Sequence, residues 1–294
     1  MKGMYRLATP TGVGAVLKKH GFRFKKSLGQ NFLVDENIRA KIVSAAELTG
    51  QDVAWEIGPG IGTLTQALAD AAGYVFAVEL DERLLAILAE TLAGYQNIRV
   101  IHGDFLGVDL GELYRESRLK MGPEGSLKIV ANLPYYVTTP VIARILEASL
   151  DWQLMVVMVQ AEVAARMVAP PGGKDYGMLS VLVQYYTETK AVARAPRTVF
   201  MPQPEVDSTV VRLRRRPVPR VVPADSRFFF ALVRAAFGQR RKTLRNAVKS
   251  LAGLDPSSLE GAFVLASIDP MRRGETLSLE EFAALADAIL AMRG

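Results

Sequence analysis

The sequence contains no cysteine and only two histidines, His20 and His102. The absence of cysteine excludes disulfide bonds and thiolate metal ligands, and two histidines leave little material for a histidine-based triad or a zinc site. No apolar run exceeds six residues, whereas a membrane-spanning helix needs about 20. Residues 1–30 also lack the apolar core of a signal peptide. We therefore expect a soluble, cytoplasmic protein with no metal site.

Acidic residues are scarce in two parts of the chain that are rich in lysine and arginine. Residues 1–41 carry nine Lys/Arg and two acids, and residues 207–250 carry twelve Lys/Arg and two acids. The rest of the chain has a net charge of −11, against +6 for the whole. Two basic segments on an acidic body favour a polyanionic partner, with nucleic acid first. Charge that serves only solubility is the alternative.

Apolar strand-like runs alternate with helical patterns through most of the chain. Continuous apolar strands in such an alternation are typical of a parallel sheet covered on both faces. The fold class is therefore predicted to be α/β, with a doubly wound, mostly parallel sheet. The predicted strands are 52–57, 74–79, 98–101, 127–132, 154–160, 187–192 and 209–214.

Helices are predicted between these strands and in the last third of the chain. Asp35 is a candidate N-cap, and Thr139 is expected to cap a helix whose first residue is Pro140. Three prolines within residues 214–223 then break the alternation, and the pattern that follows is helical. We predict a first domain over 1–216, with a basic segment at 1–34, and a smaller all-helical domain over 217–294. The expected helices are 35–47, 63–72, 81–93, from 140, from 161, 228–237, 242–251, 257–265 and 279–292.

A glycine-rich turn follows the first long strand in the stretch VAWEIGPGIGTLT, residues 53–65. Gly58 and Gly60 let a ligand approach the backbone, but Pro59 removes one N–H that a pyrophosphate would use. Glu79 ends the second strand and is placed to accept from ribose hydroxyls, and Asp104 follows the third, where it can accept from an adenine amino group. A site that suits a ribose and an adenine without phosphates indicates S-adenosylmethionine as the cofactor and therefore a methyltransferase. A nicotinamide-dependent oxidoreductase is the weaker alternative.

The stretch NLPY, residues 132–135, follows the next strand on the same edge of the sheet. An exocyclic adenine amine is a poor nucleophile because its lone pair is delocalised into the ring. Two acceptors that hold its N–H groups favour a pyramidal nitrogen, whose lone pair is available for methyl transfer. Asn132 can supply its side-chain oxygen, and the carbonyl of Leu133 or Pro134 can supply the second acceptor. Tyr135 offers a face on which the base can stack. An ordinary strand end followed by a proline turn is the alternative interpretation.

These motifs resemble the KsgA family of ribosomal RNA adenine dimethyltransferases, from about Lys26 to the C-terminal helices. SLGQNFL (27–33), EIGPGIGTLT (56–65), NLPY (132–135), FMPQPEVDS (200–208) and AFGQRRKTLRN (236–246) carry the resemblance. It implies dimethylation of two adjacent adenosines in the 3′-terminal hairpin loop of small-subunit (16S) rRNA, coupled to 30S biogenesis. Glu205 departs from the basic or neutral residue that family members often carry. The implied residues are Gln30, Asn31, Leu33, Gly58, Gly60, Glu79, Asp104 and Asn132 for S-adenosylmethionine, and Asn132, Leu133, Pro134, Tyr135 and Phe200 for the acceptor pocket.

Two basic segments are candidates for RNA contact. Arg241, Arg245 and Lys249 recur every four residues and predict a basic ridge on one helix, to which we add Lys242. A merely solvated helix face is the alternative. The N-terminal segment with Lys18, Lys19, Arg23, Lys25 and Lys26 is expected either to close over the cofactor and touch the RNA or, over 1–20, to be a disordered leader.

The sequence thus predicts a S-adenosylmethionine-dependent rRNA adenine N6-dimethyltransferase that acts on the small subunit or its precursor. A large-subunit rRNA dimethyltransferase is one alternative, and a non-catalytic ribosome-assembly or RNA-binding factor on the same fold is another. No surplus amphipathic stripe calls for an oligomer, so a monomer is expected. Tyr136 has no assigned role, since it can stack on the base or support Tyr135.

Overall fold

The computed structural model describes residues 5–25 and 29–293, which form two compact units. The first unit contains the described residues up to Ala164 together with Thr189–Arg215, and the second contains Ala165–Glu188 and the residues from Arg216 onward. The predicted division is therefore wrong for residues 165–188, which were assigned to the first domain. Tyr176, Val181 and Tyr185 of this segment share one hydrophobic core with Phe229 of the C-terminal helices.

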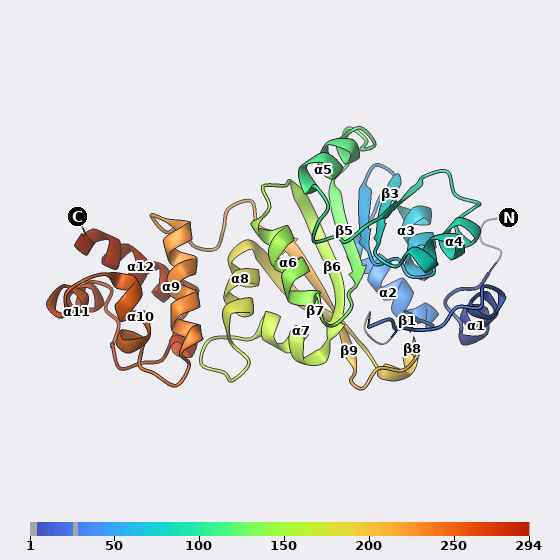
Figure 1. Cartoon of the computed structure of the whole chain (residues 1–294). Coiled ribbons are helices and arrows are strands. Elements are labelled where there is room, and N and C mark those ends of the chain that lie inside the picture. Colours follow the sequence, from blue (N-terminus) through green and yellow to red (C-terminus); the bar gives the residue numbers. More distant parts are fainter. Residues whose placement is uncertain (1–4, 26–28, 294) are drawn as a thin grey trace. The chain divides into compact units, whose positions relative to one another are not determined.

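The sheet contains the strands Val53–Ile57 (β2), Tyr74–Glu79 (β3), Ile98–His102 (β4), Leu127–Asn132 (β5), Trp152–Gln160 (β6), Thr187–Ala195 (β7) and Ser208–Arg215 (β9). Their order is β4-β3-β2-β5-β6-β9-β7. Figure 1 labels β3, β5 and β6 of this sheet. The pairs from β4 to β6 are parallel, and β9 runs antiparallel to β6. The predicted doubly wound, mostly parallel sheet is confirmed. Because β2 pairs with β3 on one side and β5 on the other, the strand order reverses at β2 and β5.

Both faces of the central strands are covered, which explains why their sequences are mostly apolar. All five residues of β2 are buried. Ala54 packs with the helices Glu36–Ala46 (α2) and Thr63–Ala71 (α3), whereas the indole of Trp55 donates to Ser117 on the helix Leu110–Arg118 (α5) at 2.7 Å. Successive side chains of a strand point to opposite faces, so β2 lies between two helical layers.

The carboxylates that precede two helices fix where those helices begin. Asp35 accepts from the N–H of Ile38 at the start of α2, as predicted. Asp81 accepts from the N–H of Arg83 at the start of Glu82–Thr91 (α4). Satisfying these orphan N–H groups stabilises a helix start by about 1 kcal/mol. The helix Thr138–Glu147 (α6) also belongs to the first unit, and Ala161–Val168 (α7) begins in the first unit and ends in the second.

The start of α6 differs from the prediction that Thr139 caps the helix. The helix begins at Thr138 with Val137 at the N-cap, and Pro140 lies at the third helical position. Proline is tolerated there because the N–H groups of the first turn have no partner within the helix. The hydroxyl of Thr138 donates to the carbonyl of Pro134 at 3.1 Å, which ties the helix to the preceding loop.

The N-terminal segment contains a helix that the sequence pattern did not indicate. Pro10–Lys19 (α1) buries Val13, Val16 and Leu17 against Ile61 and Leu84 of the first unit. The expectation of a disordered leader over 1–20 is therefore wrong for residues 5–20, and residues 1–4 lie outside the described part of the chain. Further along, Phe32–Leu33 (β1) pairs antiparallel with Phe200–Met201 (β8).

The second unit is helical, as predicted for the C-terminal domain. Its core combines aromatic and aliphatic side chains, including Phe229, Phe263 and Phe282. None of the helices in the described residues is long and apolar enough to cross a membrane. The helices are Met178–Tyr186 (α8), Ser226–Gly238 (α9), Leu244–Ala252 (α10), Pro256–Leu265 (α11) and Leu279–Arg293 (α12).

Candidate active site

A pocket opens at the carboxyl ends of β2, β3, β4 and β5, where the strand order reverses. Ligands of open α/β sheets bind at this kind of position. The structure brings together all the residues proposed from the sequence for the cofactor and the acceptor base. They are Gln30, Asn31, Leu33, Gly58, Gly60, Glu79, Asp104, Asn132, Leu133, Pro134, Tyr135 and Phe200.

The glycine turn after β2 forms the floor of the pocket. Gly58 and Gly60 have φ angles of 70° and 61°, a left-handed backbone that other residues rarely adopt. A Cβ on Gly60 would lie 2.9 Å from the Phe32 ring, so only glycine lets the N-terminal segment pack on the turn. The turn therefore needs glycine both for its conformation and for its contact with Phe32.

Glu79 is buried at the end of β3, and backbone N–H groups fix its carboxylate. Its two oxygens accept from the N–H of Asp81 at 2.7 Å and from the N–H of Gly60 at 3.1 Å. Burial raises the pKa of Glu79, and the two N–H donors oppose that rise. Each carboxylate oxygen keeps a lone pair for a ribose hydroxyl. Asp104, after β4, is exposed and accepts from the N–H of Leu106 at 2.9 Å.

Glu56 is a site residue that the sequence analysis did not single out. It belongs to β2, lines the pocket and is 2% exposed. Its Oε2 has no hydrogen-bond partner among the described residues. Burial raises the pKa of Glu56 to about 8; the nearby Thr65 hydroxyl opposes the rise and the neighbouring Glu79 charge adds to it. A carboxylate inside an otherwise apolar strand, two residues before the glycine turn, was a signal that could have identified it.

The N-terminal segment reaches the pocket through a chain of polar contacts. Gln30 donates from Nε2 to Asp81 Oδ2 at 2.6 Å, and Arg83 donates from Nε to Asp81 Oδ1 at 2.8 Å. Arg83 also donates from Nη1 to the carbonyl of Arg23 at 2.9 Å. The hydrogen bond from Arg83 holds the pKa of Asp81 below its usual range. Lys26 of the predicted basic cluster and the first two residues of the SLGQNFL motif (27–33) lie outside the described residues.

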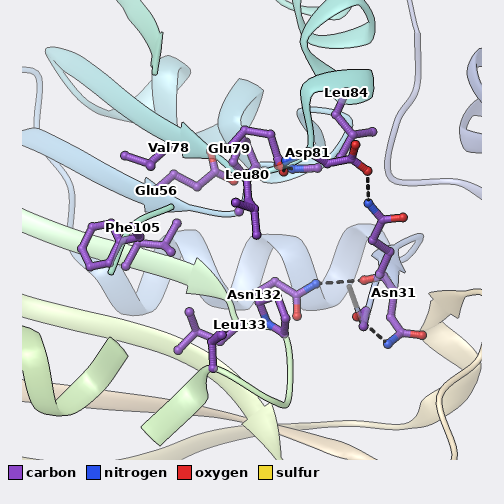
Figure 2. Close-up of a pocket in the computed structure, with 18 of the residues that line it drawn as sticks. Asn31, Glu56, Val78, Glu79, Leu80, Asp81, Leu84, Phe105, Asn132 and Leu133 are labelled. Carbon is purple, nitrogen blue, oxygen red and sulfur yellow. Dashed lines mark hydrogen bonds between the residues drawn. The ribbon is translucent and has the colours of Figure 1, made fainter. Parts of the chain in front are cut away.

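Asn132 is oriented by the backbone of the N-terminal segment. Its Nδ2 donates to the carbonyl of Asn31 at 3.1 Å (Figure 2), an interaction between residues 101 positions apart. Since the amide nitrogen is used in this way, the amide oxygen is the atom presented as an acceptor. The side chain is partly buried at the carboxyl end of β5.

The hydrogen bonds of the loop after Asn132 distinguish the two carbonyls, of Leu133 and Pro134, that were considered as the second acceptor for the adenine amino group. The carbonyl of Pro134 accepts from the N–H of Val137 at 3.2 Å and from the hydroxyl of Thr138 at 3.1 Å. It is therefore engaged at the start of α6. The carbonyl of Leu133 is the better candidate. The N–H of Leu133 donates to the carbonyl of Met158 at 3.2 Å, which fixes the main chain at this residue.

The aromatic residues proposed for the acceptor base come from different elements. The hydroxyl of Tyr135 lies 3.3 Å from Ser208 Oγ on β9, and burial raises the pKa of Tyr135. Phe200 of β8 is 3% exposed and pairs with Leu33 of β1. Both rings line the pocket.

The predicted basic ridge of the second unit is only partly correct. Arg241 and Lys242 are exposed but precede α10, so only Arg245 and Lys249 share that helix. Arg245 lies 3.6 Å from Glu260, with both side chains about half exposed. Leu244 and Val248 of the same helix are buried. Arg240 points instead into its own unit, where it donates to the carbonyl of Tyr176 at 2.8 Å.

The described residues contain no group of three or more histidines or acids that could hold a metal ion. The donor set of the pocket suits S-adenosylmethionine. The carboxylates of Glu79 and Asp104 are fixed by backbone N–H groups and can accept from hydroxyl and amino groups, and Oε2 of Glu56 can accept from a cationic group.

Comparisons with known proteins identify close relatives. A family model described as ribosomal RNA adenine dimethylase matches residues 21–285. The ribosomal RNA small subunit methyltransferase A of Geobacillus sp. (strain WCH70) is 52% identical over 286 residues, which are 96% of this chain and 97% of that protein. The protein of the same name from Bacillus mycoides (strain KBAB4) is 50% identical over 98% of both chains.

Two solved structures share the fold. A dimethyladenosine transferase from Plasmodium falciparum has a TM-score of 0.68 at 25% identity, over 86% of this chain and 95% of that chain. The 23S rRNA methyltransferase ErmE has a TM-score of 0.66 at 29% identity, over 88% and 99%. The chain therefore belongs to the ribosomal RNA adenine dimethylase family, whose members are S-adenosylmethionine-dependent methyltransferases.

Proposed function

We propose that this protein dimethylates, at N6, two adjacent adenosines in the 3′-terminal hairpin loop of 16S rRNA, with S-adenosylmethionine as the methyl donor. The observation that carries the proposal is one pocket that joins Glu79 and Asp104 to the Asn132–Tyr135 loop. The first two suit an adenosine without phosphates, and the loop suits a second, acceptor adenine. Relatives at 50–52% identity named as small-subunit methyltransferases support the choice of RNA.

The residues of the pocket have separate roles in this reaction. Bound S-adenosylmethionine supplies an electrophilic methyl group. Glu79 holds the ribose hydroxyls, Asp104 accepts from the adenine amino group, and Glu56 pairs with the ammonium of the methionine part. Gln30, Asn31, Leu33, Gly58 and Gly60 complete the wall of this half of the pocket.

The acceptor adenine must leave its loop to reach this rim. Its amino group donates to Asn132 Oδ1 and to the Leu133 carbonyl, while Tyr135 and Phe200 stack on the ring. Both acceptors are neutral and weakly basic, so they position the nitrogen rather than deprotonate it. Catalysis then rests on orientation and electrostatics, which together account for large parts of enzymatic rate enhancements.

The second candidate function is dimethylation of large-subunit rRNA, favoured by the similarity to ErmE. That similarity is 29% in sequence, compared with 52% to the small-subunit enzyme from Geobacillus. The small subunit is therefore the preferred substrate, either mature or as a 30S precursor. We further propose that the protein acts as a cytoplasmic monomer without a metal ion.

The proposal is tested with labelled S-adenosylmethionine and small subunits whose 16S rRNA lacks N6,N6-dimethyladenosine. The label is expected in the two adjacent adenosines of the 3′-terminal hairpin. We expect Asn132→Ala to lower kcat by about a hundredfold or more, because a transition-state hydrogen bond is lost. Asn37→Ala, on the exposed side of α2, is the matched control and should leave kcat unchanged. Label in 23S rRNA, or normal activity of Asn132→Ala, would contradict the substrate or the pocket mechanism, respectively.

A further inference from the structure

The two adjacent tyrosines after Pro134 point to different parts of the pocket. Tyr135 reaches β9, where its hydroxyl lies 3.3 Å from Ser208 Oγ. Tyr136 lines the same pocket but is 52% exposed. It does not support Tyr135 from the core, which was one of the two roles considered from the sequence. The structure therefore leaves Tyr136 with a large, accessible ring in the pocket proposed to hold two adenine bases.

The neighbours of Tyr136 are those of the cofactor half of the pocket. A Cβ placed on Gly29 would lie 3.6 Å from Cδ1 of Tyr136 and 3.6 Å from Cβ of Pro134, so the N-terminal segment passes against the ring and the loop that carries it. The charges of Asp104 and Glu79 lie close enough to add to the effect of burial in raising the pKa of Tyr136. Tyr135, by contrast, has Asp207 as its charged neighbour.

The positions of these neighbours are well determined by backbone contacts. Glu79 is held by the N–H groups of Gly60 and Asp81, and Asp104 is held by the N–H of Leu106. Gly29 has a φ of 56° and its carbonyl accepts from Asn31 Nδ2 at 3.1 Å. Tyr136 therefore lines the same pocket as Glu79 and Asp104, the two acids proposed to hold the adenosine part of a ligand, and it lies beside Gly29.

We propose that Tyr136 is a cofactor-positioning residue, whose ring covers the adenosine part of S-adenosylmethionine, while Tyr135 alone serves the acceptor adenine. The inference rests on the proposed roles of Glu79 and Asp104. The two tyrosines thus separate the pocket into a donor side and an acceptor side. An aromatic ring suits the donor side because every adenine presents a π-face that an aromatic side chain can cover.

The test measures cofactor binding to the full-length chain without RNA. Isothermal titration with S-adenosylmethionine and with adenosine alone is compared for wild type, Tyr136→Phe, Tyr136→Leu and Tyr136→Ala. We expect Tyr136→Ala to raise both Kd values by about tenfold and Tyr136→Phe to bind as wild type does, since the ring rather than the hydroxyl provides the cover. Tyr136→Leu should lie between them, and it decides the question if the alanine variant does not fold.

Tyr135→Ala is the matched control. It should leave both Kd values unchanged and lower kcat on small subunits. In steady-state assays Tyr136→Ala should raise KM for S-adenosylmethionine and leave KM for the small subunit unchanged, a separation that a general loss of structure would not produce. Unchanged cofactor Kd values with a raised KM for RNA would overturn the proposal and place Tyr136 on the acceptor side.

The outcome for Tyr136 is separable from that of the proposed function. If wild type binds S-adenosylmethionine but does not methylate small subunits, the proposed RNA is wrong and the tenfold effect of Tyr136→Ala still supports its role. If wild type methylates small subunits and Tyr136→Ala binds the cofactor normally, the role of Tyr136 is wrong and the function stands.

Discussion

At the scale of single residues, the most unusual group is the carboxyl of Glu56. It is buried in β2 beside the glycine turn, and one of its oxygens has no partner among the described residues. A buried acid without a cation is stabilised in its neutral form. Oε2 of Glu56 can therefore accept a hydrogen bond from a cationic ligand, because no cationic side chain among the described residues occupies that position.

This arrangement predicts a pH dependence of stability. The pKa of Glu56 rises from 4.5 in a model peptide to about 8 in the folded protein. Between these values the folded state binds more protons than the unfolded state, so the free energy of unfolding falls as the pH rises. The contribution is fully present below pH 4.5 and is lost as the pH passes through about 8.

Urea unfolding between pH 5 and pH 8.5 measures this effect. Glu56→Gln should show a smaller decline of the free energy of unfolding than wild type, because glutamine does not titrate. Glu112→Gln, at an exposed position of α5, should follow wild type. Parallel curves for wild type and Glu56→Gln would show that Glu56 is ionised in the folded protein.

At the scale of elements, α1 is an integral part of the first unit. Leu7 and Val16 are fully buried, and the carbonyl of Leu7 accepts from the hydroxyl of Thr63 at the start of α3. On the solvent side, Lys19 and His20 contact Glu90 of α4 at 2.7 and 3.0 Å. The hydrogen bond from Lys19 lowers the pKa of Glu90 to about 2.

Removing the apolar contact should therefore destabilise the protein. We expect Leu7→Ala to lower the free energy of unfolding by about 2–4 kcal/mol, the usual range for a buried leucine. Lys18→Ala, on the exposed face of α1, should have little effect. Urea denaturation at constant pH compares the two variants. Equal stability of Leu7→Ala and wild type would mean that the segment leading into α1 does not pack as described.

We propose that the basic residues at and just before the start of α10 contact RNA, and this offers a second test at this scale. Arg241→Ala with Arg245→Ala should weaken binding to the 3′-terminal hairpin RNA and make the dependence of log Kd on log salt shallower by about 1–2. Arg240→Ala is the control, because Arg240 bonds to the carbonyls of Lys174 and Tyr176 within its own unit. Fluorescence anisotropy at several KCl concentrations gives the slopes. A slope that is unchanged in the double variant would exclude phosphate contact at these two arginines.

At the scale of the whole molecule, the sequence predicted the sheet far better than the helical parts around it. The strand Leu127–Asn132 was predicted with its observed bounds, because a buried parallel strand is a short apolar run with clear ends. Met178–Tyr186 was missed because its residues are apolar on nearly every side and show no helical period. Pro10–Lys19 was missed because two glycines interrupt it.

The candidate site was predictable where it depends on motifs and not where it depends on contacts between distant segments. Each motif ends a strand, and parallel strands bring their carboxyl ends to one edge, so Gly58, Glu79, Asp104 and Asn132 were expected to meet. The choice of Leu133 over Pro134 required the hydrogen bonds at the start of α6. The membership of residues 165–188 in the second unit required the packing of Tyr185 on Phe229.

The contact between Asn132 and Asn31 has a consequence for how this enzyme must be studied. The atom that orients the Asn132 amide is a main-chain carbonyl, which every amino acid at position 31 retains. An alanine scan would register Asn132 as essential and would assign no such role to its partner. The orientation of Asn132 therefore depends on the course of the main chain at position 31. Only a change that alters the main chain, such as a deletion or a substitution by proline, would test this contact.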